Sequence, residues 1–435
     1  SNMRSLKVKK IDIIAFVLLF LIFTYSFTKA GIHDYIYPNS IACYISFGII
    51  ILFSILLGSI SSIRKCTLLE GMMLLCMIVI LCNRNNNFIH GEFEDGFSFI
   101  AIAIFFLLVR KQDSWHKLIM PIIWFWVAIH TIVTLLEYAV PGFYMSQIFP
   151  LMPSYAEMHL RSVFKLGYMP GLAVHYSTNG MYLAVGLIIS GISLLFSKVH
   201  KRIGAIVFIV TAVALLLTGK RGLIIFPAAA LVMVYYLYNS DKPLSRLGKI
   251  IVLAIAVIVL FTIGSTFIPS LSNFINRFVE TSEAGDVSLG RLEQSALALN
   301  VFSHNWLFGT GWDSFKYLYK AQFGTLLNVH NIYIQLLSEN GIIGAFPFFV
   351  FFIAAFFRAI KSLIYLRKYY TGEYYAGEFY IGLSLAMQCF FLLYGMTGNP
   401  LYDQQVFYPY IVSIAAGEFY VDQVYHMIRT AEVSK

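Results

Sequence analysis

The sequence predicts an all-α polytopic membrane protein with about 12 transmembrane helices. Of its 435 residues, 59% are hydrophobic and 12% are charged, and the mean hydropathy is +0.75. A soluble globular domain carries about 25% charged residues. Long apolar runs recur from one end of the chain to the other. Such runs predict helices, because a helix satisfies its backbone hydrogen bonds within the segment that crosses the lipid.

Twelve apolar runs are candidate spans: residues 11–29, 40–60, 67–82, 97–109, 118–139, 176–197, 203–219, 222–239, 250–268, 333–357, 377–397 and 405–423. The first follows a basic stretch and is expected to be an uncleaved signal anchor. A single helix over residues 203–238 would be about 54 Å long, against a hydrocarbon core of about 30 Å. We therefore expect a reversal at "TGKRG", where Gly219 and Gly222 flank Lys220 and Arg221.

The distribution of basic residues predicts the orientation. Twelve spans place both termini on one side, and the segments on that side carry 21 of the 31 lysines and arginines. Cytoplasmic loops hold this excess, so both termini are expected to be cytoplasmic. The net charge of +9 is then mostly a topology signal and does not call for nucleic acid.

The spans divide the chain into five expected regions: N-terminal transmembrane helices (1–139), an outer loop (140–175), central transmembrane helices (176–268), a long outer loop (269–330) and C-terminal transmembrane helices (331–435). The stretch "GRLEQSALALNVFSHNWLFG" predicts short amphipathic helices in the long outer loop, at the membrane surface. Long structured loops often carry function. The five cysteines are scattered and form neither a disulfide framework nor a metal spacing, so packing is their expected role.

Several cations and other polar groups lie in the predicted outer segments, although most basic residues lie in the predicted cytoplasmic ones. Singly, such an arginine often reaches toward lipid phosphates, and a histidine at a helix start is often a capping group. Their convergence, without a matching cluster of carboxylates, instead favours an anionic ligand. In the tenth span, Asn331, Gln335, Ser338 and Glu339 share one helical face, which should look into protein or a hydrated cavity. The outer cations and histidines are Arg161, Lys165, His175, Lys220, Arg221, Arg291 and His330.

Four motifs carry a resemblance to a known family. "GTGWDSFKYLYKAQFGTLLNVHNIYIQLLSENGIIGA" resembles the hallmark segment of the O-antigen polymerase and ligase family, and "LLLTGKRGLIIF" resembles its arginine turn between two spans. "SLGRLEQSALALNVFSHNWLFGTGW" and "RSVFKLGYMPGLAVHYSTNGMYLA" are similar to two further outer stretches of that family. The resemblance is best over residues 161–345. The turn departs from the family pattern at Lys220, where a small residue is usual.

The resemblance implies a GT-C-like membrane glycosyltransferase, of which a Wzy-type polymerase is the favoured form. Its substrate would be a polyprenyl-pyrophosphate-linked oligosaccharide, at the outer face of the bacterial cytoplasmic membrane. Guanidinium groups suit a pyrophosphate, and a neutral imidazole suits a sugar hydroxyl that must lose its proton. His330 is therefore the expected base, with Arg221 and Arg291 on the pyrophosphate and Lys220 and Arg161 as helpers.

The remaining expected substrate-binding or orienting residues are Lys165, His175, Asn179, Asn331, Gln335 and Glu339. No metal or other cofactor is expected. A pyrophosphate leaves without needing an acid, so a carboxylate pair like that of a glycosidase is unnecessary. The expected partners are the lipid-linked substrate, membrane lipids and a membrane protein that regulates chain length. His130 and Glu137 in the fifth span either contribute to the site or form a buried structural pair.

Three alternatives remain open. A ligase would use the same donor and the same histidine and arginines to place a glycan on lipid A core or protein. A metal-dependent glycosyltransferase would need outer carboxylates, for which "HDY" at 33–35 and "GEFEDG" at 91–96 are the best places. A flippase for lipid-linked oligosaccharides would need ionisable groups near the bilayer midplane instead of at the outer ends of the spans.

Overall fold

The computed structural model describes residues 2–58, 67–83, 93–196, 201–238, 247–250, 272, 291–369 and 375–433. Within these ranges the regular structure is helical, apart from one isolated β-bridge between Gly31 and Ala173. Among the described residues, seven helices are long and apolar enough to cross a membrane. The prediction of a polytopic helical membrane protein is confirmed.

Helices occupy eleven of the twelve predicted spans. They are α1 (Asn2–Thr28), α3 (Ser40–Gly58), α4 (Leu68–Cys82), α5 (Glu94–Val109), α6 (Ile119–Ala139), α9 (Tyr176–Phe196), α10 (Lys201–Leu217), α11 (Arg221–Tyr238), α16 (Ile332–Tyr369), α17 (Tyr375–Tyr394) and α18 (Gln404–Val433). The ninth predicted span, 250–268, lies outside the described residues except for residue 250. Because α4, α5 and α10 have only 15, 16 and 17 residues, each is about 22–26 Å long. The count of twelve and the GT-C-like architecture therefore stay predictions.

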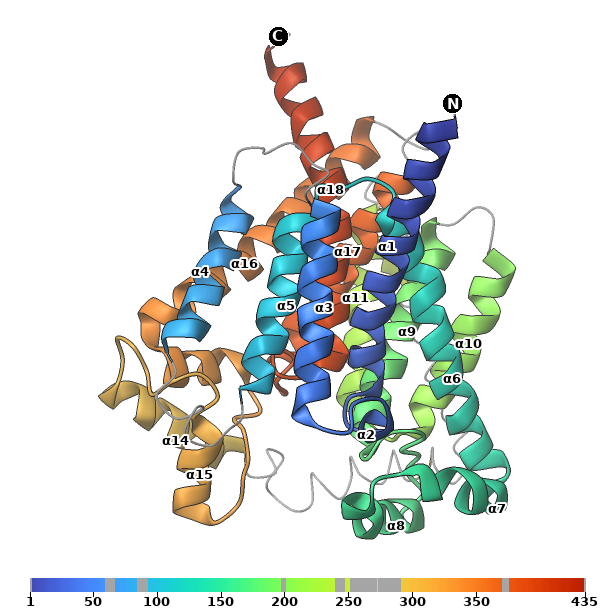
Figure 1. Cartoon of the computed structure of the whole chain (residues 1–435), viewed down its shortest axis with the longest axis vertical. Coiled ribbons are helices and arrows are strands. Elements are labelled where there is room, and N and C mark those ends of the chain that lie inside the picture. Colours follow the sequence, from blue (N-terminus) through green and yellow to red (C-terminus); the bar gives the residue numbers. More distant parts are fainter. Residues whose placement is uncertain are drawn as a thin grey trace.

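Both chain ends lie at one end of the helix bundle, and short helices cover the opposite end (Figure 1). Figure 1 places α7 (Pro141–Phe143), α8 (Glu157–Lys165), α14 (Arg291–His304) and α15 (Phe315–Phe323) there. A further short helix is α2 (His33–Ile36). Three 3-10 helices, η1 (Trp115–Leu118), η3 (Phe149–Leu151) and η4 (Ser154–Ala156), and one π-helix, η2 (Tyr144–Ile148), complete the described helices. The short helices predicted in the long outer loop are thus present as α14 and α15. We call the end that carries them the loop end.

A buried ion-pair network ties four helices together at the end that carries the termini. Arg110, fully buried after α5, lies 3.1 Å from Glu70 of α4 and 3.2 Å from Asp422 of α18. Arg358 of α16 lies 2.8 Å from both Glu418 and Asp422. A charge in a membrane protein's interior is costly unless it is paired. The network therefore fixes the packing of the helices whose other ends approach the candidate site.

The predicted reversal between residues 203 and 238 is confirmed. Helix α10 ends at Leu217, α11 begins at Arg221, and Gly219 between them has a φ of 69°. Glycine adopts this left-handed conformation without steric cost. The second expected turn glycine, Gly222, lies instead in the first turn of α11. The reversal places Lys220 between the two helices and Arg221 at the start of the second.

Helix α16 is interrupted at Gly341, whose φ of 62° and ψ of −174° are not helical. At the break, backbone amides of α16 form hydrogen bonds with the segment before α15 instead of within the helix. The amides of Ile342 and Ile343 donate to the carbonyls of Trp306 and Leu307, at 2.8 and 3.2 Å. A short helix with one polar face, residues 332–340, therefore precedes the longer apolar one. This explains how a polar face can stand at the start of a membrane helix.

Two glycines make the junction between α16 and that segment possible. A Cβ atom on Gly309 would lie 2.3 Å from the backbone carbonyl of Glu339, and one on Gly341 would lie 2.3 Å from the carbonyl of Leu307. Both glycines also have positive φ values. The two backbones approach so closely that only glycine fits at either position. We call this contact the glycine junction.

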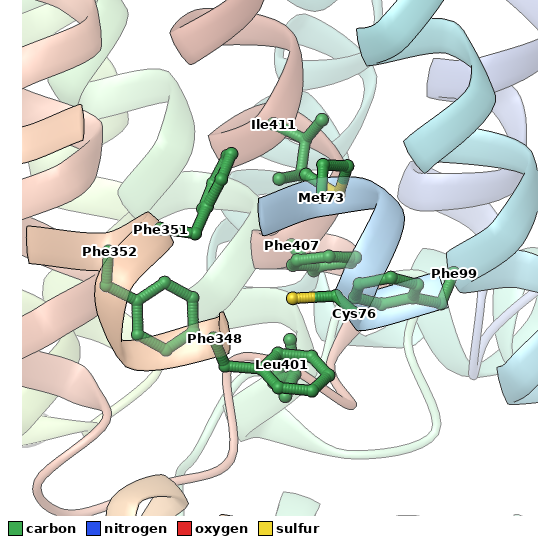
Figure 2. Close-up of a pocket in the computed structure, with 9 residues that line it drawn as sticks. All are labelled: Met73, Cys76, Phe99, Phe348, Phe351, Phe352, Leu401, Phe407 and Ile411. Carbon is green, nitrogen blue, oxygen red and sulfur yellow. The ribbon is translucent and has the colours of Figure 1, made fainter. Parts of the chain in front are cut away.

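An apolar cavity lies between α4, α5, α16 and α18 (Figure 2). The ring of Trp312, just after the glycine junction, stacks on Phe348 at 5.8 Å and meets Phe99 edge-on at 6.0 Å. Because every lining side chain is apolar, the cavity belongs to the hydrophobic core and does not suit a sugar or a phosphate. Its lining residues are Met73, Cys76, Phe99, Phe348, Phe351, Phe352, Leu401, Phe407 and Ile411.

Candidate functional site

His330 lies in a short segment that is held firmly in front of α16. The next residue, Asn331, caps the helix, because its side-chain oxygen accepts hydrogen bonds from the amides of Tyr333 and Ile334, both at 3.1 Å. The amide of Ile332 donates to the carbonyl of Gly395 in the loop between α17 and α18, at 2.8 Å. The backbone next to His330 is thus held by α16 and by the loop between α17 and α18. These contacts fix the position of the half-buried His330 imidazole.

Two cations from distant parts of the chain act on His330. Burial is the largest cause that lowers its pKa to about 4, followed by the positive charges of Arg291 and Lys220. Both effects disfavour the charged imidazolium. The imidazole is therefore neutral near pH 7 and can accept a proton. The structure thus brings Arg291, Lys220 and His330 into one electrostatic environment.

Lys220 projects from the turn between α10 and α11 toward an aromatic ring. Its ammonium lies 5.5 Å from the centre of the Tyr176 ring, at the start of α9. Such a contact attracts a cation to the ring face. Arg221 is half-buried and is the first residue of α11. Lys220, where the turn departs from the family pattern, is therefore the turn residue whose charge lowers the pKa of His330.

One carboxyl group lies beside these cations, a feature that the sequence argument did not anticipate. Asp403, between α17 and α18, accepts a hydrogen bond from the hydroxyl of Tyr394 at 3.4 Å. Burial raises the pKa of Asp403 to about 7, against the lowering effects of that hydrogen bond and of Lys220. The only sequence signal was a single acid in a short, otherwise uncharged loop. The outer charge pattern that predicts the site consists of cations, so it does not point to Asp403.

The side chains of Glu339 and Gln335 connect the segments around the candidate site through hydrogen bonds. The Glu339 carboxylate, fully buried, accepts hydrogen bonds from the amides of Asp313 and Phe315 at 3.0 and 3.2 Å. It also accepts from the side chain of Gln335 at 3.0 Å and from the hydroxyl of Tyr402. Together with Asn331 and Ser338, these two residues form the polar face expected to look into protein. Gln335, Ser338 and Glu339 are fully buried, and Asn331 is half-buried. In this arrangement Gln335 and Glu339 orient the loops, and a contact with sugar stays a prediction.

The outer-loop residues predicted for the site fall into two groups. Asn179 is fully buried and donates to the hydroxyl of Thr134 and the carbonyl of Met169, at 2.8 and 3.0 Å, so it fastens the outer loop to α6. His175 stacks on Tyr176 at 4.3 Å, next to Lys220. His175 is therefore linked to Lys220 through the ring of Tyr176.

Arg161 and Lys165 occupy exposed positions on α8. The guanidinium of Arg161 pairs with Glu157 at 2.8 Å and lies 4.9 Å from the ring centre of Phe149. These contacts engage the guanidinium with other outer-loop residues, and Arg161 is not among the charges that lower the pKa of His330. A helper role for Arg161 stays a prediction.

His130 and Glu137 are both buried, and each has a partner of its own. The His130 ring bonds to the carbonyl of Phe27 at 2.8 Å, and the Glu137 carboxylate accepts from the amide of Gly171 at 2.8 Å. These contacts support structural roles for both. No hydrogen bond joins the two among the described residues.

Two of the acids suggested for a metal site are engaged in ion pairs, whereas residues 91 and 92 of "GEFEDG" lie outside the described residues. Lys29 lies 2.7 Å from Glu94 and 3.7 Å from Asp95, and the hydroxyl of Tyr25 donates to Glu94 at 2.8 Å. Across the described ranges, histidines, cysteines and acids do not gather in threes as a metal site would need. The "HDY" side chains at 33–35 are described only in part, since the placement of the His33 side chain is left out.

Fold and site together define a polytopic helical membrane protein with a histidine and two cations clustered at the end opposite its termini. Residues 206–349 match the family model described as O-antigen ligase. This segment contains the turn at Lys220, Arg291, the glycine junction and His330, and the match is consistent with the O-antigen polymerase and ligase family. Enzymes of this family are membrane glycosyltransferases or ligases. No curated protein matches the chain.

Proposed function

We propose that this protein is a polymerase of polyprenyl-pyrophosphate-linked oligosaccharide repeat units. The observation that carries the proposal is the neutral imidazole of His330 beside the positive charges of Arg291 and Lys220. A base and an anion site in one place are what glycosyl transfer from a pyrophosphate requires. O-antigen, capsule and exopolysaccharide repeats all fit this description.

In the proposed reaction, a hydroxyl of the acceptor sugar attacks the anomeric carbon of the donor glycan. The hydroxyl proton moves to His330 as the new glycosidic bond forms. The bond from the anomeric carbon to the phosphate oxygen breaks, and its electron pair leaves with the pyrophosphate. Arg221 and Arg291 bind the pyrophosphate oxygens, and Lys220 adds charge beside them. Direct displacement inverts the anomeric configuration, so retained configuration in the product would argue against this mechanism.

The protein is proposed to lie in the bacterial cytoplasmic membrane, with both termini cytoplasmic and the site on the outer face. The excess of basic residues on the side of the termini supports this orientation. The loop end, with α8, α14 and α15, would then face outward, where lipid-linked repeat units are joined. Membrane lipids would surround the bundle, and a chain-length-regulating membrane protein is a further proposed partner.

The test is a reconstitution of the purified protein with lipid-linked repeat units alone. Wild type should form a ladder of longer products, and His330→Ala should lose at least about a hundred-fold in rate, as removal of a general base does. His330→Gln is the matched variant, because it keeps the size and polarity but cannot accept the proton. Wild-type rates in His330→Ala would contradict the proposal.

A ligase is the second candidate, and the description of the matching family as O-antigen ligase favours it. A ligase would use the same base and cations but would place the glycan on lipid A core or protein. The same reconstitution separates the two. Product that forms only after a second acceptor is added would identify a ligase.

A further inference from the structure

The loop between α17 and α18 contacts the chain on both sides of His330. On one side, the carbonyl of Gly395 accepts a hydrogen bond from the amide of Ile332 at 2.8 Å. On the other side, the Asn399 side-chain amide, oriented by its hydrogen bonds, donates to the carbonyl of Val329 at 2.8 Å. This loop is therefore fastened next to the candidate base, and its remaining residues lie beside the site.

Asp403 ends this loop, and among the described residues its carboxyl group bonds to a tyrosine instead of capping the next helix. The amide of Asp403 donates to the carbonyl of Asn399 at 3.0 Å, so both belong to one turn. An aspartate directly before a helix ordinarily accepts hydrogen bonds from the first amides of that helix. Here the amides of Val406 and Phe407 donate to the backbone carbonyl of Asp403. The carboxyl group accepts from the hydroxyl of Tyr394 at 3.4 Å.

Groups from three other parts of the chain act on this carboxyl group. Lys220 and the hydrogen bond from Tyr394 favour its ionised form, whereas burial and the negative charge of Asp95 disfavour it. Asp95 lies 3.7 Å from Lys29, its own cationic neighbour. Burial is the largest of these effects, and it raises the pKa of Asp403 to about 7. About half of these carboxyl groups are therefore protonated at pH 7.

Further ionisable groups near the loop have other partners. Glu339 of α16 accepts a hydrogen bond from the hydroxyl of Tyr402. Glu94 of α5 lies 2.7 Å from Lys29, and the hydroxyl of Tyr182 in α9 donates to the carbonyl of Lys29. These contacts fasten the helices around the loop.

An ionised Asp403 would oppose the cations that are proposed to bind the donor. Lys220 acts on both His330 and Asp403, so the carboxyl group and the candidate base share one cation. A carboxylate at this place would repel a pyrophosphate bound at Lys220. A protonated carboxyl group carries no charge, and its O–H group donates a hydrogen bond to an anionic oxygen. The negative charges of a bound pyrophosphate favour the protonated form further.

We propose that Asp403 binds the pyrophosphate of the donor as a neutral carboxylic acid, whose O–H group donates a hydrogen bond to a phosphate oxygen beside Lys220. This inference rests on the proposed function and adds a hydrogen-bond donor to the cations of the pyrophosphate site. The proton enters from solvent when the donor binds and returns to solvent when the pyrophosphate leaves. As the bond from the anomeric carbon to the phosphate oxygen breaks, negative charge grows on the pyrophosphate and strengthens this hydrogen bond.

The experiment measures the binding of a probe that has the charged group of the donor but no sugar. The probe is farnesyl methyl pyrophosphate, a diester in which each phosphate keeps one negative charge throughout the pH range used. A terminal phosphate would itself titrate near pH 6, so a monoester is avoided. The purified protein in detergent micelles is titrated with the probe by calorimetry from pH 6 to pH 8, and thermal unfolding verifies that every variant is folded.

For wild type, the Kd of the probe should rise about ten-fold from pH 6 to pH 8, because the protonated fraction of Asp403 falls from about 90% to about 10%. Asp403→Asn keeps a neutral hydrogen-bond donor of the same shape, so its Kd should stay within about two-fold of the wild-type value at pH 6. Asp403→Leu lacks a donor and should bind about ten-fold more weakly than Asp403→Asn at each pH. Glu157→Gln, which removes an exposed acid of α8, should keep the wild-type pH dependence.

Proton uptake gives a second measurement that needs no weakened variant. Calorimetry at pH 7.5 in two buffers of different ionisation enthalpy should show uptake of about half a proton or more per bound probe in wild type, and none in Asp403→Asn. A wild-type Kd that does not change between pH 6 and pH 8 would overturn the proposal. So would an Asp403→Leu variant that binds as tightly as Asp403→Asn, since the carboxylate would then only repel the probe when ionised.

The probe carries no sugar, so its binding is measured independently of glycan transfer. Wild type that takes up a proton with the probe but forms no polymer would remove the proposed polymerase and retain Asp403 as a pyrophosphate-binding acid. Wild type that forms polymer but binds the probe equally at all pH values would retain the polymerase and remove this inference.

Discussion

Replacing Lys220 by glutamine should move the acid side of the pH–rate profile toward neutral pH. Burial is the largest cause that lowers the pKa of His330 to about 4, and Arg291 and Lys220 add to it. The substitution removes one positive charge and leaves the burial in place. The pKa of His330 should therefore rise but stay below its ordinary value of about 6.5.

The size of the effect follows from the fraction of neutral imidazole. At pH 5, an imidazole with a pKa of about 4 is neutral in roughly 90% of molecules, whereas one with a pKa of about 6.5 is neutral in roughly 3%. A general base acts in its neutral form, so about thirty-fold in rate is the upper bound. Lys220→Gln should lose several-fold at pH 5, relative to its own rate near neutral pH. Lys220→Arg keeps the charge and should follow wild type.

The assay is kcat/KM for lipid-linked repeat units across the pH range from about 4.5 to 8. This parameter reports the ionisations of the free enzyme, which is the state described by the structure. Each enzyme is normalised to its own plateau, because loss of Lys220 also weakens binding of the anionic donor. An acid limb near 6.5 in wild type, or one that does not move in Lys220→Gln, would refute the electrostatic assignment of His330.

Two further predictions concern the glycine junction and the topology. Gly309→Ala and Gly341→Ala should each lower thermal stability and activity, because the added Cβ would lie 2.3 Å from backbone atoms. Gly324→Ala is the control, because Gly324 has a similar positive φ but no neighbour within 4 Å. It should show only the smaller cost of backbone strain. Equal losses in all three would mean that strain alone matters. In a cysteine-free variant, a cysteine at the exposed Asn300 should react with an impermeant maleimide added outside intact cells, and one at the exposed Lys201 should not. The reverse pattern would invert the proposed orientation.

The helical fold was predictable because its signals are local. Apolar runs and turn residues mark eleven helices, and the reversal at Gly219 follows from helix length alone. The sequence did not predict that α16 is interrupted at Gly341. This break depends on a second segment, near Gly309, whose backbone completes the hydrogen bonds that the kink leaves open. A contact between two segments cannot be read from either one.

The residue types of the candidate site could be predicted from the sequence, but the contacts between those residues could not. Outer cations and His330 stood out against the charge bias of the loops, whereas Asp403 did not. Arg161 pairs with Glu157 and is not among the charges that lower the pKa of His330.

The sequence by itself determined that the chain crosses a membrane many times, which side its basic loops favour, and which polar groups stand at the opposite side. These properties follow from the hydrophobicity and charge of short segments. Only the tertiary structure shows that Lys220 and Arg291 act on His330, and that the buried Glu339 carboxylate accepts hydrogen bonds from backbone amides. It also shows that the rings of His159 and His175 stack on each other. The physical reason is distance along the chain: burial and electrostatic coupling arise only when segments far apart in sequence are packed together.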